Sequence, residues 1–288
     1  MKRLILLIPF LLLTSLLFSQ KVLNVVVVGA HPDDCDLDAG GTAIQYVRAG
    51  HKVLFISLTN GDAGHYEKGG GILGQIRRAE AQEAGRRFGV EYIVMDNHDG
   101  ELMPTLENRL DLIRLIRKWN ADIVIGPRPN DYHPDHRNTA ILLQDAAFMV
   151  IVPNVASDVP ALKTNPVFLY AEDRFQKPYP FLPDIAVDIT DVYDQKIYSA
   201  AAHESQFFEW LPWLSGQLDA VPESDAERVK WLAEKRKPSI SNDVRKALIK
   251  WYGTEKGGSA VVAEAFEICE YGRRPSDEEI KRLFPMLK

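Results

Sequence analysis

Residues 22–34 have the sequence VLNVVVVGAHPDD, and this stretch decides the fold. The run from Val22 to Val28 is rich in β-branched residues and lacks the polar alternation of a half-exposed strand. Such a run is typical of a strand that is buried on both faces of a parallel sheet. The polar motif that follows, His31 to Asp34, comes at the carboxyl end of this strand, where open α/β sheets bind their ligands.

Similar short apolar runs recur along the first half of the chain, and helical patterns separate them. The predicted strands are residues 22–28, 51–59, 91–95 and 121–126, and the predicted helices are residues 40–49, 73–88, 108–119 and 136–149. This alternation of strand and helix predicts an α/β fold of the Rossmann-like, doubly wound type. We therefore expect a mostly parallel sheet with helices on both faces.

The chain changes character after residue 150, where prolines divide short apolar segments. Residues 167–170 and 185–189 are two of these segments, and helical patterns follow at residues 192–208, 226–235 and 243–251. The simplest expectation is one domain over residues 21–210, with a C-terminal helical extension over residues 211–288 that packs on the same domain.

The composition indicates a globular protein with a real core, because 46% of the 288 residues are hydrophobic and 26% are charged. The formal net charge is -6, which gives no electrostatic reason to bind nucleic acid or an anionic membrane surface. We expect neither partner. Only two cysteines are present, Cys35 and Cys269, so the fold is not a disulfide scaffold.

The first twenty residues have the three-part pattern of a secretory signal. Lys2 and Arg3 precede an apolar run over residues 4–13, which Pro9 interrupts. The run falls short of the roughly 20 apolar residues that span a bilayer. We therefore predict a cleaved signal peptide over residues 1–20, no membrane span in the mature chain, and a secreted or periplasmic protein.

A second polar motif, His133-Pro134-Asp135-His136, also follows a predicted strand and precedes a helix. The two motifs then lie at the same edge of the sheet and offer imidazole and carboxylate ligands to one ion, with open positions for water. This ligand set is typical of a catalytic zinc site. An Asx turn in the first motif and a helix N-cap at Asp135 are the structural alternatives, but the N-cap leaves both histidines unexplained.

The order and spacing of these motifs resemble those of the PIG-L or LmbE-like zinc N-deacetylases. The resemblance runs over about residues 22–206 and includes Ala39-Gly40-Gly41-Thr42, the Arg-x-x-Glu of Arg77 to Glu80, and His203-x-Ser205-Gln206. It implies that residues 21–210 are a deacetylase domain. It also implies hydrolysis of the N-acetyl group of an amino sugar or glycoconjugate, so the expected substrate is a small molecule or glycan that bears this group.

The resemblance assigns a role to each residue of the two motifs. The implied zinc ligands are His31, Asp34 and His136, with one ion per chain and other divalent transition metals as alternatives. A zinc-bound water would attack the amide with Asp33 as the general base, and His133 would be the protonated partner that stabilises the oxyanion. Asp135 is expected to orient the imidazole of His133 and keep it cationic.

Two positions depart from the pattern of the family. Cys35 stands where relatives commonly have glutamate, and we expect it to pack as a small buried residue behind the turn. Tyr132 directly precedes His133, whereas the corresponding tyrosine of some relatives stands two positions before this histidine. A catalytic role for Tyr132 is therefore not predicted.

Four further residues are candidates for substrate binding, and each also has a structural explanation. They are Arg77, Asp62, Asp99 and His203. Asp62 and Asp99 follow strands at the edge that bears the motifs, where glycine-containing turns are equally expected. Arg77 also fits a solvated helix face, and His203 fits a histidine paired with a neighbour inside a helix.

Two other functions are compatible with parts of the sequence. A non-catalytic carbohydrate-binding protein could keep a vestigial metal site. A phosphoesterase could use the same residue types, although it would be expected to hold two adjacent metal ions and more bridging carboxylates.

Overall fold

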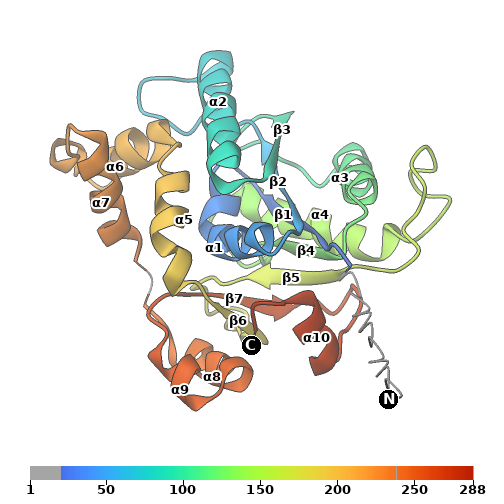
Figure 1. Cartoon of the computed structure of the whole chain (residues 1–288). Helices are drawn as coiled ribbons and strands as arrows, with labels where there is room; N and C mark the ends of the chain where they lie inside the picture. The colour runs from blue at the N-terminus through green and yellow to red at the C-terminus, as the bar shows by residue number, and fades with distance from the viewer. Residues whose placement is uncertain (1–20, 238, 288) are drawn as a thin grey trace, which may run out of the picture.

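A computed structural model describes residues 21–237 and 239–287, and the predicted signal peptide at residues 1–20 lies outside them (Figure 1). The described residues form a sheet with the strand order β3-β2-β1-β4-β5-β7-β6. The first five strands of this order are β1 (Asn24–Gly29), β2 (Lys52–Thr59), β3 (Glu91–Asn97), β4 (Ile123–Gly126) and β5 (Val167–Ala171). They pair in parallel, which confirms the predicted doubly wound, mostly parallel sheet.

Strand β1 shows why the apolar run forms a central strand, because its side chains enter two different cores. Val25 and Val27 face one core, and Val26 and Val28 face the other. The first core includes residues of α1 (Asp34–Arg48), α2 (Gly70–Phe88) and α5 (Tyr193–Ala200). The second includes residues of α3 (Leu106–Lys118) and α4 (Pro134–Met149), so helices cover both faces of the sheet (Figure 1).

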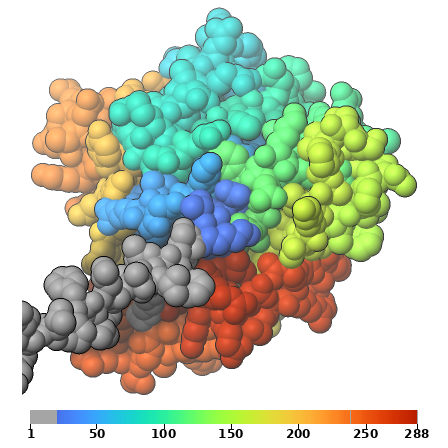
Figure 2. All heavy atoms as spheres, turned by 45° about the vertical axis from the view of Figure 1, so that its right-hand side comes forward, coloured from blue at the N-terminus to red at the C-terminus, as the bar shows by residue number. Residues whose placement is uncertain are grey.

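The C-terminal segment adds a strand to the sheet, which the predicted helical extension did not include. Strand β7 (Ala263–Ile268) lies antiparallel between β5 and β6 (Ile185–Asp188). Its sequence, AEAFEI, is rich in residues that favour helices, so cross-strand pairing prevails over local propensity. In Figure 2 the residues after 260, in red, lie directly beside the early part of the chain, in blue. The division at residue 210 stays a prediction.

The other regular elements of this segment are helices and one 3-10 turn. Its helices are α6 (Leu211–Leu214), α7 (Asp225–Arg236), α8 (Asn242–Tyr252), α9 (Thr254–Ser259) and α10 (Asp277–Leu283). Short 3-10 turns cover Thr190–Val192 and Leu218–Ala220. Among the helices of the described residues, none is both long enough and apolar enough to cross a membrane.

Most predicted helices differ from the structure by up to three residues at an end, and two differ by more. The helix predicted at residues 40–49 begins at Asp34, directly at the first motif. The helix predicted at residues 192–208 is interrupted, because α5 ends at Ala200 and a π-helix covers Ser205–Trp210. His203 therefore lies in the break and not inside a continuous helix. Single-turn π-helices often occur at functional sites.

The buried carboxylate of Glu264 ties β7 to α1. One of its oxygens accepts the backbone N–H of Gly41 at 2.8 Å, and the other accepts that of Thr42 at 2.7 Å. The ammonium of Lys196 in α5 neutralises this carboxylate at 2.7 Å and also donates to the carbonyl of Leu37. The helix that begins at the first motif is thus held by β7, the last of the described strands in the sequence.

Candidate active site

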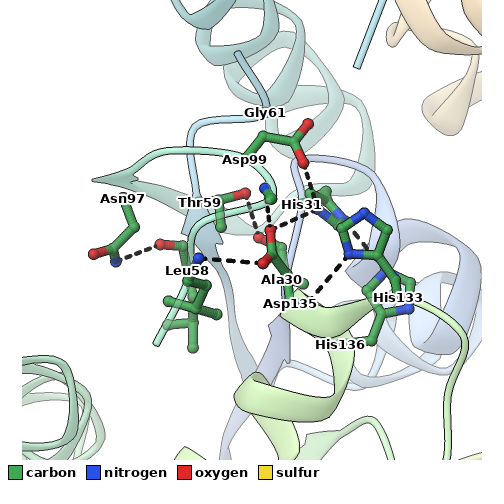
Figure 3. A network of polar contacts seen from close by, with 12 residues as sticks. Ala30, His31, Leu58, Thr59, Gly61, Asn97, Asp99, His133, Asp135 and His136 are labelled. Carbon is green, nitrogen blue, oxygen red and sulfur yellow. Dashed lines mark hydrogen bonds and ion pairs between the residues drawn. The ribbon is translucent and has the colours of Figure 1, made fainter. Parts of the chain in front are cut away.

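The two polar motifs meet where the strand order reverses. The first follows β1 and the second follows β4, and these neighbouring strands lead to opposite halves of the parallel sheet. Such a switch point is the usual ligand site of an open α/β sheet. Figure 3 shows the side chain of His31 from the first motif beside those of His133, Asp135 and His136 from the second. Two overlapping groups have ligand atoms within 4.8 Å of one another: His31, His133 and His136, and His31, Asp99, His133 and Asp135.

The three predicted metal ligands form a triangle that fits one ion. The Nδ1 atom of His31 lies 3.2 Å from Nε2 of His136 and 3.6 Å from Oδ2 of Asp34. Nε2 of His136 lies 3.5 Å from the same carboxylate oxygen. Ligand atoms of a tetrahedral zinc ion, at about 2.1 Å from the metal, are about 3.4 Å apart. The backbone N–H groups of Ala30 and His31 hold this oxygen, each at 2.8 Å.

Each of the two imidazoles also has a carboxylate at its other nitrogen. Nε2 of His31 lies 3.1 Å from Oδ1 of Asp99 and 3.3 Å from Oδ2 of Asp135. Nδ1 of His136 lies 3.1 Å from Oδ2 of Asp131, a residue that the sequence analysis did not select. Metal-ligating histidines usually have such a partner, which fixes the ring and makes the ligating nitrogen more basic.

The charges around the triangle favour a cation. Burial opposes ionisation of Asp34, but the nearby His136 and His31 hold its pKa well below the usual range. Despite burial, hydrogen bonding to His31 also lowers the pKa values of Asp99 and Asp135. Burial opposes protonation of His136, yet Asp34 and a second carboxylate raise its pKa to about 9. Ionised carboxylates therefore surround two basic imidazoles, and the donor set is one that binds a divalent transition metal.

Asp33 is held in a strained conformation beside the triangle. Its φ of 156° and ψ of -21° lie in a region that residues with a side chain rarely adopt. Strain of this kind persists only where the surrounding structure enforces it, and it is common at active sites. Burial raises the pKa of the Asp33 carboxyl, and the Arg77 guanidinium at 3.1 Å partly offsets this effect.

Arg77 is buried and engaged with protein groups, whereas a substrate-binding role or a solvated face was expected. Only 2% of the residue is exposed. Its guanidinium donates to Oδ1 of Asp33 and the carbonyl of Pro32, both at 3.1 Å, and to the carbonyl of Gly61 at 3.3 Å. Gly61 has φ of 69°, and a Cβ atom there would lie 2.4 Å from Nη1 of Arg77. The turn after β2 thus requires glycine to admit the guanidinium.

The expected link between Asp135 and His133 is wrong. The fully buried carboxylate of Asp135 bonds instead to His31 and accepts the backbone N–H groups of Gly100 at 2.7 Å and Leu102 at 3.2 Å. His133 is the N-cap of α4, and its Nδ1 accepts the backbone N–H of Asp135 at 3.2 Å. Burial, with His31 and other positive charge, lowers the pKa of His133, which favours the neutral form of this imidazole.

A cavity of about 490 Å³ opens over these groups. Its lining includes predicted residues, namely His31, Asp33, Asp34, Arg77, Asp99, His133 and His136. It also includes residues that the sequence analysis did not select, namely Leu37, Tyr132, Gln206, Trp210, Leu211, Leu214 and Arg236. Gln206 belongs to the late motif that carries the resemblance, whereas Trp210, Leu211, Leu214 and Arg236 come from the segment after it, where the sequence has no recognisable motif.

Two predicted substrate contacts and Cys35 lie away from this cavity. Asp62 orders the neighbouring loop, because its carboxylate accepts the N–H of Asp99 at 3.0 Å and contacts His98 at 2.6 Å. His203 is fully buried, with Nε2 3.0 Å from Oδ1 of Asp36. Neither residue is among those that line the cavity. Cys35 is fully buried and its thiol faces backbone carbonyls, which confirms the expected packing role.

Comparisons with known proteins identify the family of the chain. Residues 26–147 match the family model described as PIG-L, GlcNAc-PI de-N-acetylase. The chain belongs to this family, whose members are hydrolases that act on N-acetyl amides.

Three proteins illustrate how far the likeness extends. Diacetylchitobiose deacetylase of Thermococcus kodakarensis is 32% identical over 206 residues, which cover 68% of this chain and 76% of the relative. The probable N-acetyl-alpha-D-glucosaminyl L-malate deacetylase 2 of Bacillus cereus is 25% identical, over 73% of this chain and 94% of the relative. The structure of N,N'-diacetylchitobiose deacetylase from Pyrococcus horikoshii aligns with a TM-score of 0.63 and 25% identity, covering 86% of this chain and 84% of that one.

Proposed function

We propose that this protein removes the N-acetyl group of an N-acetylglucosamine residue and that zinc occupies the triangle of His31, Asp34 and His136. The observation that supports this most directly is the spacing of those three ligand atoms beside a buried, strained carboxylate. The named relatives support the substrate class, because diacetylchitobiose and the glucosaminyl malate both contain an N-acetylated glucosamine unit.

Asp33 has the properties of the general base. A bound zinc ion would polarise the amide carbonyl and acidify a water molecule at the site. Asp33 lines the same cavity and takes the proton of the attacking water. Burial raises the pKa of Asp33, which makes it a stronger base, while the charge of Arg77 acts in the opposite direction. The same carboxyl then returns the proton to the departing amine.

His133 acts as a neutral donor in this proposal. Its Nδ1 accepts the N–H of Asp135, so the ring proton resides on Nε2. That N–H stabilises the oxyanion of the tetrahedral intermediate as a hydrogen-bond donor. The initial expectation of a cationic His133 is replaced, because protonation of Nδ1 would break the cap of α4.

An acetate-release assay on the zinc-loaded protein tests the proposal. We expect release from N-acetylglucosamine derivatives, abolished by a chelator and restored by zinc. Asp33→Asn should keep the bound metal and lose activity by about 10²- to 10⁴-fold, the usual contribution of a general base. Asp96→Asn is the matched control, because the side chain of Asp96 is 87% exposed.

The outcomes also separate the other candidate functions. Full activity of Asp33→Asn would overturn the role of the base. Sugar binding without any acetate release would favour a non-catalytic carbohydrate-binding protein, and two metal ions per chain with phosphate-ester hydrolysis would favour a phosphoesterase.

We also propose that the mature protein works outside the cytoplasm, either secreted or in the periplasm. The sequence of residues 1–20 supports this, with its basic start and apolar run. Expression of the full chain, followed by fractionation and N-terminal sequencing, tests it. We expect an exported product that begins near residue 21, and a cytoplasmic product that retains Met1 would contradict the proposal.

A further inference from the structure

Gln206 lines the cavity over the metal ligands, which we call the metal-site cavity, and the proposed hydrolysis does not use it. It is the second residue of the π-helix Ser205–Trp210, and only 3% of it is exposed. A polar side chain that is buried to this extent normally has hydrogen-bond partners for its polar atoms. The two atoms of its amide group differ in this respect.

The amide nitrogen of Gln206 is fixed by two acceptors. Nε2 donates to the carbonyl of Gly64 at 3.0 Å and to Oγ of Ser205 at 3.3 Å. A backbone carbonyl can only accept, so the contact with Gly64 by itself requires the NH₂ group on this side. The hydroxyl of Ser205 agrees with this orientation, because it donates its own hydrogen to Oε2 of Glu80 at 2.7 Å. The amide group is therefore held in one orientation.

The amide oxygen of Gln206, Oε1, has no partner in the described part of the chain. No donor there hydrogen-bonds to Oε1, and this atom is not among the buried side-chain atoms that lack a partner, so it is open to the metal-site cavity. An acceptor with a fixed direction and no protein donor can bind a ligand without breaking an existing bond. The ligand that reaches Oε1 must offer an O–H or N–H group.

Gly64 allows a ligand to approach Oε1 closely. A Cβ atom at this position would lie 3.7 Å from Oε1 of Gln206, 3.2 Å from Oδ2 of Asp99 and 3.1 Å from Nη1 of Arg77. The other oxygen of Asp99 lies 3.1 Å from Nε2 of His31, whose Nδ1 faces the metal triangle. Oε1 is therefore separated from the triangle by an imidazole ring and a carboxylate.

The proposed substrate has a hydroxyl group at a comparable separation. In N-acetylglucosamine the amide nitrogen is attached to carbon 2, and the adjacent ring carbon bears the 3-hydroxyl. When the amide carbonyl is at the triangle, the amide N–H lies beside the metal ligands, whereas the 3-hydroxyl extends farther from them, as Oε1 does. A hydroxyl group also donates to a neutral amide oxygen without any charge on the ligand.

We propose that Gln206 is a specificity-determining residue whose Oε1 accepts a hydrogen bond from the 3-hydroxyl of the N-acetylglucosamine residue that is deacetylated. The inference rests on the proposed function and adds a residue that recognises the sugar ring itself. A site that hydrogen-bonds a substrate hydroxyl rejects the analogue without it, because the protein acceptor is then left unpaired.

Three acetate-release substrates test the inference on the zinc-loaded full chain. They are the methyl glycoside of N-acetylglucosamine and its 3-deoxy and 4-deoxy derivatives. We expect kcat/KM of the wild-type protein to fall by about tenfold or more when the 3-hydroxyl is absent. Gln206→Met keeps a side chain of similar length but lacks the acceptor, so this penalty should shrink to about twofold or less. The penalty for the missing 4-hydroxyl should be the same in both proteins.

A second variant tests the same contact with Gln206 intact. Gly64→Ala places a methyl group in front of Oε1, so it should also lose the preference for the 3-hydroxyl, and its backbone has no positive φ that would strain an alanine. Gln176→Met is the matched control, because Gln176 is an exposed glutamine outside the metal-site cavity, and it should keep the wild-type ratios. Metal content and thermal unfolding show whether each variant is folded.

The ratios between substrates decide the outcome. An unchanged 3-deoxy penalty in the two variants, or equal losses on all three substrates, would overturn the inference and leave deacetylation intact, since the wild-type protein would still release acetate. If the wild-type protein released no acetate from the parent glycoside or from other N-acetylglucosamine derivatives, the proposed function itself would fail.

Discussion

Replacing Arg77 by methionine should shift the pH dependence of the reaction. Nη2 of Arg77 lies 3.1 Å from Oδ1 of Asp33, and both side chains are buried. At an effective dielectric constant of about 20, two charges at this distance attract each other by about 5 kcal/mol, an upper bound of about 4 pKa units. Water that fills the vacated space reduces the effect, so we expect a rise in the Asp33 pKa of about 1 to 2 units.

The sign of the change follows from the role of Asp33. The reaction requires ionised Asp33, and loss of a neighbouring cation raises the pH at which this carboxyl ionises. The acid limb of the kcat/KM profile should therefore move upward by about 1 to 2 pH units, with about a 10- to 100-fold loss at pH values below the wild-type limb that recovers as the pH rises. Acetate release measured from pH 5 to 10, with metal content determined for each sample, provides the profile.

Two further variants sharpen this test. Arg77→Lys keeps a positive charge beside Asp33 and should restore most of the profile. Arg78→Met removes the adjacent guanidinium, which pairs with the exposed Asp96, and should leave the acid limb in place. An unchanged acid limb in Arg77→Met with full metal content would refute the assignment of Asp33 as the base that Arg77 tunes.

The remaining predictions concern the metal, one turn and one thiol. Because the pKa of His136 is about 9 without metal, zinc binding at pH 7 should release at least one proton, and the apparent zinc affinity should rise about tenfold per pH unit for each proton. Equal binding heats in buffers of different ionisation enthalpy, measured by calorimetry, would contradict this. Gly61→Ala should lower the free energy of unfolding by more than the roughly 1 to 2 kcal/mol of positive-φ strain, because the added methyl group displaces Arg77. Gly50→Ala has open space around the added methyl group, so it should show the strain alone in the same unfolding experiment. Cys35→Ala should lower the free energy of unfolding by about 1 to 2 kcal/mol through lost packing, and the variant should keep its metal and its activity. A loss of bound metal, measured by metal analysis of the purified variant, would indicate that the thiol is a ligand.

The sequence was sufficient for the parallel sheet and for the meeting of the two motifs. Strands buried on both faces have a distinct apolar pattern, and polar residues after β1 and β4 must lie at one edge when those strands are adjacent and parallel. These two facts place His31, Asp34 and His136 together without knowledge of any side-chain contact.

The partner of Asp135 could not be predicted in this way. Two histidines flank this residue within the second motif, whereas the imidazole that it contacts belongs to His31, which is 104 positions away in the sequence. The choice depends on how the loop with Gly100 and Leu102 folds over the site and supplies two N–H groups to the same carboxylate. Local spacing carries no information about such a loop.

The residues after position 206 that line the metal-site cavity could not be predicted either. Trp210 and Arg236 line the metal-site cavity, yet their positions depend on a π-helix and on the packing of α7 against α5. Neither feature has a periodic signal in the sequence. Strand β7 was missed for a related reason, because its alanine and glutamate residues favour a helix until β5 and β6 pair with it.

The bonds from Glu264 to Gly41 and Thr42 imply an order of assembly. They join residues 223 and 222 positions apart, and contacts of such long sequence separation form late in folding. The helix that contains Asp34 is thus secured only after almost the entire polypeptide has been synthesised and folded. A nascent or C-terminally shortened chain would contain all three proposed ligand side chains and still lack a fixed site. We therefore expect zinc to be acquired as one of the final steps in the maturation of the enzyme.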